Sequence, residues 1–229
     1  VFKEDSLIPH YVRQYISDES CVEKLIEFYE TKEEGKPLFA FNVTMQNHGG
    51  YQDSYDNFTP DITVTDTQNF NQYLSLIRLS DQALEELVTY FSQVDEKTVI
   101  VFFGDHQPGD AVAYSILAKN GMQWNNLDEE EQKLRYQVPY VMWANYDIDA
   151  ETGADTSANY LAAEVLERAG VPLSSYQSYL MDLKEEYPVL SAVRLQKSDG
   201  VESAVREEKS GLDTYRKLEY YQLFDYQKK

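Results

Sequence analysis

Residues 98–103 (TVIVFF) decide the fold, because their side chains are apolar on both faces of an extended chain. A run of this kind is typical of a strand in the middle of a parallel sheet, with helices covering both of its sides. Two further runs, 38–45 (LFAFNVTM) and 138–144 (VPYVMWA), are similarly aromatic and β-branched. We therefore expect three strands of one mostly parallel central sheet.

Helical patterns lie between and after these runs. Ser17 followed by two acidic residues predicts a helix to about residue 31, and a long apolar stripe predicts another over 69–92. Capping residues predict two more, one from 155 or 156 to 169 and one over 174–187. Strands that alternate with helices indicate an α/β fold with helices flanking the sheet. The polar residues 50–69 are expected to form a surface loop.

Composition narrows the possible functions. The chain has 229 residues, 42% of them hydrophobic, which suffices for one sizeable core. Its net charge of −20 argues against a nucleic acid partner, because such a surface repels phosphates. The longest apolar run, 99–103, is far shorter than the roughly 20 residues that span a bilayer, so this stretch of chain is expected to be soluble.

Two domain segments are expected. Residues 1–195 carry the strand and helix pattern and should form the body of a catalytic domain. Residues 196–229 are charged at first and then rich in tyrosine and phenylalanine. We expect a linker there, followed by a helix that packs its aromatic face on the body.

The clearest candidate site follows the most apolar strand. In parallel α/β sheets ligands bind beyond the carboxyl ends of the strands, and Gly104, Asp105 and His106 lie at that point. A carboxylate and an imidazole can bind one cation together, and the glycine leaves room for close approach. The same residues also fit a turn in which Asp105 accepts hydrogen bonds from local amides and His106 lies on the surface.

A second candidate, His48, follows the run 38–45 and is flanked by Asn47 and two glycines. Such a histidine can donate a hydrogen bond to an anionic oxygen of a substrate, with the glycines allowing the ligand to come near. It can equally be a polar loop residue with no function. The residues alone leave both interpretations open.

Three segments together carry a family resemblance. The run 37–50 (PLFAFNVTMQNHGG), the sequence VFFGDH at 101–106 and the run 138–145 (VPYVMWAN) resemble lipoteichoic-acid-synthase-like phosphoglycerol transferases of the sulfatase/alkaline phosphatase superfamily. The resemblance extends from about residue 17 to about residue 192. One departure is Gln107-Pro108-Gly109, which replaces the tyrosine that usually follows the Gly-Asp-His triplet, and it leaves the exact substrate open.

The resemblance implies roles for three residues. Asp105 and His106 match the pair that binds the catalytic divalent ion, commonly manganese, and His48 matches the histidine that contacts the substrate phosphate. The nucleophilic threonine and the first acidic metal ligand precede the matching segment. We therefore expect a fragment with an incomplete N-terminal half, no nucleophile of its own and no activity alone.

The resemblance also implies the function of the parent protein. We expect a metal-dependent phosphoglycerol transferase that acts on an anionic lipid headgroup or a glycerol-phosphate polymer at the extracellular face of the cell membrane, to which the parent protein is anchored. One alternative is a sulfuric or phosphoric ester hydrolase of the same superfamily. Another is a non-catalytic surface domain that binds glycan or protein through its 19 tyrosines.

Overall fold

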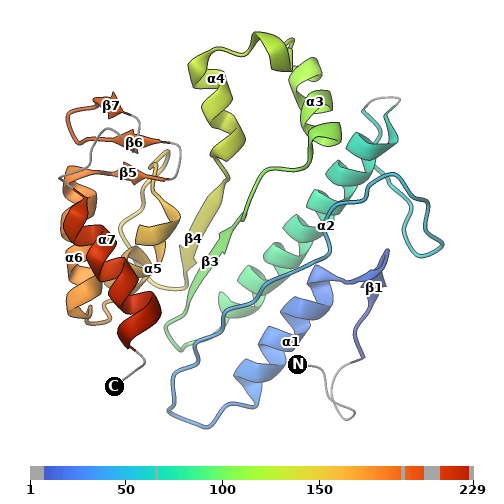
Figure 1. Ribbon diagram of the computed structural model, residues 1–229. Coiled ribbons are helices and arrows are strands. Elements are labelled where there is room, and N and C mark those ends of the chain that lie inside the picture. The colour runs from blue at the N-terminus through green and yellow to red at the C-terminus, as the bar shows by residue number, and fades with distance from the viewer. Residues whose placement is uncertain (1–7, 65–66, 192–193, 204–211, 227–229) are drawn as a thin grey trace. The chain divides into compact units, whose positions relative to one another are not determined.

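The computed structural model describes residues 8–64, 67–191, 194–203 and 212–226, and it divides into two compact units, Val1–Asn145 and Tyr146–Lys229. The first unit alternates strands and helices (Figure 1). Its elements are β1 (Tyr11–Val12), β2 (Tyr15–Ile16), α1 (Asp18–Glu30), α2 (Gln68–Phe91), β3 (Val99–Phe103), α3 (Asp110–Lys119), α4 (Glu129–Lys133) and β4 (Tyr140–Ala144), with 3-10 turns at Trp124–Asn126 and Leu134–Tyr136. The expected α/β class is confirmed.

Helices α1 and α2 pack side by side (Figure 1). The Ser17 hydroxyl caps α1 by accepting from the Ser20 amide, as its sequence predicted. The buried face of α2 includes Phe70, Leu76 and Phe91. Phe70 and Leu76 join Tyr51 and Val112 of α3 in one apolar cluster, so α2 links the α1 side of the unit to α3.

Strands β3 and β4 pair antiparallel, with Val99 opposite Ala144 and Phe103 opposite Tyr140. Every strand pair in the described residues is antiparallel, so the parallel pairing expected for 98–103 is not found there. The physical reason is the connection between the two strands. The chain leaves β3 at Phe103, passes through α3 and α4, and enters β4 at Tyr140, which lies opposite Phe103, so the two strands run in opposite directions. Gly104 continues the pairing by donating to the Pro139 carbonyl at 3.1 Å.

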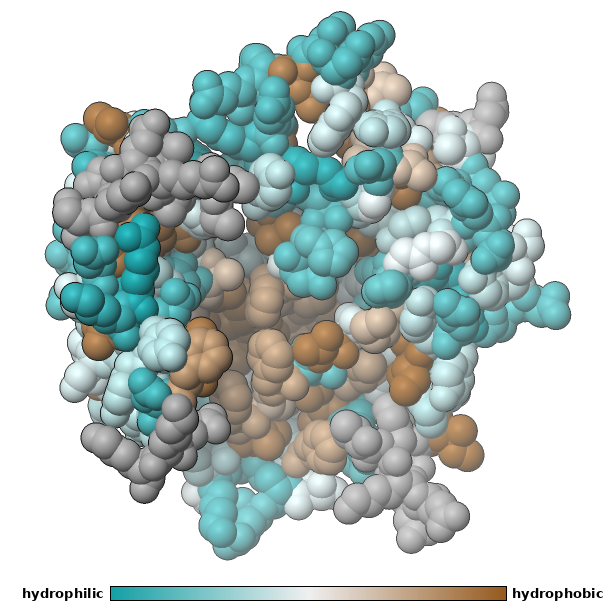
Figure 2. Space-filling view, viewed as in Figure 1, coloured by the Kyte–Doolittle hydropathy of each residue, from teal (hydrophilic) through white to brown (hydrophobic). Residues whose placement is uncertain are grey.

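Residues 38–45 do not form the buried strand that their sequence predicted. No described segment pairs with them, and Phe39 and Phe41 are 88% and 71% exposed. Their composition favours an extended chain, but a strand needs a neighbour for its amides and carbonyls. Figure 2 shows apolar side chains gathered over β3, β4 and this segment. The exposed apolar residues there are Leu38, Phe39, Phe41, Val43, Met45, Phe102, Phe103 and Val141.

The second unit contains helices α5 (Ala158–Arg168), α6 (Ser175–Glu186) and α7 (Asp213–Tyr220), and a small sheet of β5 (Val189–Leu190), β6 (Leu195–Gln196) and β7 (Glu202–Ser203). A turn of π-helix, Tyr221–Asp225, extends α7. Its core gathers Tyr160, Leu183, Leu195 and Leu212, with Tyr215 packed against it.

Part of the expected linker, residues 204–211, lies outside the described residues, and the division at 195 stays a prediction. The polar residues 50–69 form no helix or strand up to residue 64, as expected of a loop. None of the helices in the described part of the chain has the length and apolar content needed to cross a membrane.

Candidate functional site

A tight turn presents His48. The His48 amide donates to the Met45 carbonyl at 3.0 Å, and the two side chains between them point into the protein and anchor the turn. Gln46 is 1% exposed and its Oε1 accepts from the Asp18 amide at 3.0 Å. The side-chain amide of Asn47 donates from Nδ2 to Ser80 Oγ on α2 at 2.7 Å. The turn is therefore fixed to both helices, while the His48 side chain remains exposed.

Arg13 holds the backbone of this turn from the other side. Its Nη2 donates to the carbonyls of Gln46 and His48 at 2.6 and 2.7 Å, and its Nη1 reaches the carbonyl of Gly50 at 3.4 Å. The guanidinium is also surrounded by tyrosine rings, with the centroid of Tyr51 5.4 Å away. Cation–π attraction and these charge-assisted bonds stabilise a cation that is only 4% exposed.

A buried carboxylate lies beneath the turn. Asp18 is 4% exposed, and its Oδ2 accepts from the hydroxyl of Ser80, which in turn accepts from Asn47. Its Oδ1 is buried, and no donor from the described part of the chain hydrogen-bonds to it. Burial raises the pKa of Asp18, and the hydrogen bond from Ser80 only partly offsets that shift. A chain of polar side chains thus connects α1 and α2 to the turn that carries His48.

Asp105 and His106 lie side by side just beyond β3. The carboxylate Oδ2 of Asp105 is 3.5 Å from Nε2 of His106, and both side chains are exposed. Asp105 Oδ1 accepts from the His106 amide at 2.8 Å, and His106 Nδ1 is 2.8 Å from the Gln107 carbonyl. The amide capping expected of a simple turn is therefore present, and so is a paired oxygen and nitrogen donor set within reach of one cation.

Gly104 does not leave space for a cation beside Asp105 and His106. A Cβ at this position would lie 3.2 Å from the Cβ of Val138, so the glycine permits close approach of the neighbouring chain before β4. No cluster of three or more histidine, cysteine, aspartate or glutamate side chains that could hold a metal occurs within the described ranges. Asp105 and His106 supply two donors, and a complete site takes more.

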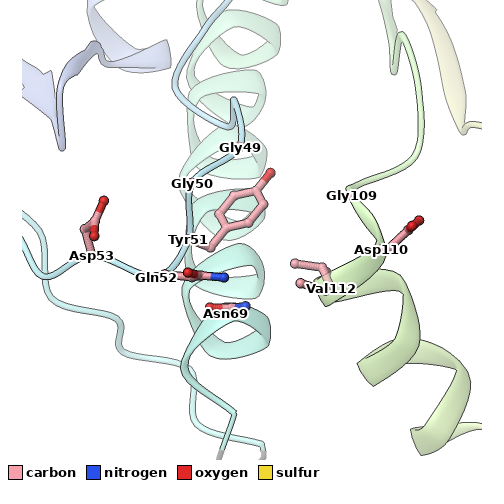
Figure 3. Close-up of a pocket in the computed structure, with 10 residues that line it drawn as sticks. Gly49, Gly50, Tyr51, Gln52, Asp53, Asn69, Gly109, Asp110 and Val112 are labelled. Atoms are coloured by element: carbon pink, nitrogen blue, oxygen red, sulfur yellow. The ribbon is translucent and has the colours of Figure 1, made fainter.

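A pocket of about 270 Å³ lies between the segments that follow the two candidate sites. Its lining residues are Gly49, Gly50, Tyr51, Gln52, Asp53, Asn69, Gly109, Asp110, Ala111 and Val112. Figure 3 shows Tyr51 and Val112 pointing toward one another from facing walls. The chain following His48 therefore approaches the start of α3, which begins four residues after His106. The ring of His48 contacts Tyr15 rather than Asp105 or His106, and a shared site for the three residues stays a prediction.

The chain belongs to the sulfatase family, whose pattern it matches over residues 3–171. This match confirms the expected superfamily. Its fold is similar to that of the phosphoglycerol transferase GacH of Streptococcus pyogenes, solved in complex with sn-glycerol-1-phosphate. The TM-score is 0.57 at 18% identity, over 79% of this chain and 44% of that one. The expected alkaline phosphatase-like α/β fold is thereby confirmed.

Two relatives come from Rhizobium meliloti (strain 1021). The chain is 27% identical over 237 residues to a protein named for cyclic beta-1,2-glucan modification, covering 98% of this chain and 37% of the relative. It is 30% identical over 94 residues to the capsular polysaccharide biosynthesis protein RkpI, covering 41% of this chain and 16% of that protein. The chain therefore spans well under half the length of these relatives.

Sequence reasoning did not identify Arg13, Tyr15 or Asp18 as parts of the His48 site. Each lies at least 27 residues from the turn, and no motif links them to it. The available signal was weak: an arginine between two strand-like dipeptides, Tyr11-Val12 and Tyr15-Ile16.

Proposed function

We propose that the full-length protein is a metal-dependent phosphoglycerol transferase acting in the synthesis or modification of a cell-envelope polymer. One observation carries this proposal: Asp105 and His106 pair their donor atoms 3.5 Å apart at the end of β3 in a chain of the sulfatase family. The fold similarity to GacH, which was solved with sn-glycerol-1-phosphate, supports glycerol phosphate as the transferred group.

Asp105 and His106 would bind the divalent ion, with further ligands from outside the described residues. A carboxylate oxygen and an imidazole nitrogen suit manganese, the ion that the family resemblance implies. When bound, the ion supplies positive charge that activates the nucleophile and stabilises anionic oxygens. A local cation is needed because the chain itself carries a net charge of −20.

His48 would donate a hydrogen bond to a phosphate oxygen of the substrate. Its ring is exposed while its backbone is fixed by Arg13, Gln46 and Asn47, so the donor is held in place before the substrate binds. Overall, the P–O bond to the donor alcohol breaks and a P–O bond to an acceptor hydroxyl forms. The acceptor proton ends on the released alcohol.

The two Rhizobium relatives favour a glycan as acceptor, because one is named for glucan modification and the other for capsular polysaccharide biosynthesis. The donor would be an anionic lipid headgroup, which places the reaction at the extracellular face of the cell membrane with the parent protein anchored there. An ester hydrolase would use the same metal residues, with water as the acceptor.

The test is an assay of the full-length protein with manganese, a phosphatidylglycerol donor carrying a labelled headgroup, and a glucan acceptor. Transfer of labelled glycerol phosphate to the glucan is the expected result. Parallel reactions with a sulfate ester and a phosphate monoester measure hydrolysis. Hydrolysis of either ester without any transfer to glucan or glycerol would contradict the proposal and favour the hydrolase.

A further inference from the structure

The β1–β2 hairpin places two side chains on the His48 turn. Arg13 and Gln14 form the hairpin turn, with Tyr11 opposite Ile16 and Val12 opposite Tyr15. Arg13 has a φ of 57°, a left-handed conformation that costs a non-glycine residue about 1 kcal/mol or more. Its bonds to three carbonyls of the His48 turn offset that cost. The hairpin is therefore held against the turn by contacts specific to Arg13.

Tyr15 reaches the ring of His48 from this hairpin. Its hydroxyl oxygen is 3.2 Å from Nδ1, and the two ring centroids are 5.7 Å apart at a tilt of 59°. The same oxygen accepts a hydrogen bond from the side-chain amide of Gln14 at 3.0 Å. With its oxygen already accepting from Gln14, the phenol has its single proton available to donate to His48 Nδ1, which lies within hydrogen-bond distance.

We propose that Tyr15 is a positioning residue that fixes the tautomer of His48. When Nδ1 accepts from Tyr15, the neutral imidazole carries its own proton on Nε2. The Nε2–H group is then the available donor, which is the form that the proposed contact with a phosphate oxygen requires. This inference deepens the proposed function, and its structural part concerns only residues of this chain.

Arg13 and Tyr15 divide the task. Arg13 fixes the position of the backbone at His48 by donating to its carbonyl. Its guanidinium also lies 5.5 Å from the centroid of the Tyr15 ring. Tyr15 then sets the rotation and protonation of the imidazole. One short hairpin therefore controls both the place and the hydrogen-bonding character of the exposed histidine.

The experiment measures the ¹⁵N chemical shifts of the His48 imidazole by NMR in the 229-residue chain, at a pH where the ring is neutral. We expect the Nε2–H tautomer to dominate. In Tyr15→Phe, which keeps the ring and loses the hydroxyl, the fraction with the proton on Nδ1 should rise several-fold. Tyr11→Phe is the matched control, because Tyr11 lies on the same hairpin and is 53% exposed, and it should leave the tautomer unchanged.

The inference is overturned if the native His48 carries its proton mainly on Nδ1, or if Tyr15→Phe leaves the tautomer as it was. Should Tyr15→Phe fold poorly, Gln14→Ala provides a second variant on an exposed position, with a smaller shift in the same direction expected. In the full-length protein, Tyr15→Phe should lower kcat about tenfold with little change in KM. If Tyr15→Phe shifts the tautomer of His48 but the native full-length protein has no transferase activity, the proposed function is contradicted and the positioning role of Tyr15 stands.

Discussion

The guanidinium of Arg13 donates to the backbone carbonyl of His48 at 2.7 Å, across 35 positions of the chain. Among the residues that the structure describes, no carboxylate pairs with Arg13, and its other acceptors are the carbonyls of Gln46 and Gly50. A buried cation bound to neutral acceptors costs desolvation energy that only several good hydrogen bonds and aromatic contacts can offset. We therefore regard Arg13 as the main anchor of the His48 turn.

Replacing Arg13 by alanine should lower the free energy of unfolding by about 3 kcal/mol, because three carbonyls lose a charged donor. Urea unfolding followed by circular dichroism measures this. Arg78→Ala is the control, since Arg78 pairs with Asp61 on the exposed surface and its loss should cost less than about 1 kcal/mol. Equal effects of the two changes would contradict the anchoring role.

Substituting Gly104 by alanine should destabilise the chain by about 1–2 kcal/mol, because the new methyl group would press on Val138 across the β3–β4 pair. Gly49→Ala offers a comparison without crowding, since a Cβ there meets no atom within 4 Å. Its stability should stay the same or rise slightly. A thermal melt in which Gly104→Ala matches the native chain would disprove the close approach.

Asp18 should give the stability an unusual pH dependence. Its pKa in the folded chain is raised by burial above the ordinary value of 3.8, so its stabilising contribution is full below that value and is lost as the pH rises through the folded pKa. Asp18→Asn removes this titration. The stability of the native chain relative to Asp18→Asn should therefore increase on acidification, as measured by urea unfolding at several pH values. If the difference in the free energy of unfolding between the two chains did not change with pH, the pKa of Asp18 would not be raised by burial.

Local patterns predicted much of the fold. The stretches 17–31, 69–92 and 174–187 form α1, α2 and α6 almost as expected, because caps and apolar periodicity are properties of a short segment. The prediction for 38–45 was wrong, since extended chain becomes a strand only beside a partner and sequence does not reveal one. The antiparallel pairing of β3 and β4 depends on the path of the connection, which no local pattern encodes.

The sequence predicted only part of the candidate site. Asp105 and His106 were found because they follow an apolar strand, and the structure places their donor atoms side by side. Their metal-binding role and the role of His48 stay predictions. Arg13 and Tyr15 could not be recognised, because they reach His48 through tertiary contacts that link a hairpin to a distant turn.

Manganese should bind weakly to the 229-residue chain, with a dissociation constant no tighter than about 10⁻⁴ M, because Asp105 and His106 supply two of the four or more ligands that a site requires. Isothermal titration calorimetry measures the affinity, and Asp105→Asn should abolish what binding there is. Tight binding of one manganese ion per chain would mean that the ligand set here is already complete.

The roles of the metal pair and of His48 are separated by comparing His48→Ala with Asp105→Asn in the full-length protein, with bound metal measured by mass spectrometry and glycerol-phosphate transfer assayed in the same preparations. We expect His48→Ala to keep its metal and to lose roughly 100-fold in turnover, as for one lost charge-stabilising donor. Asp105→Asn should lose both metal and activity. Loss of metal in His48→Ala would make His48 a metal ligand, and retention of metal and turnover in Asp105→Asn would show that Asp105 does not bind the ion.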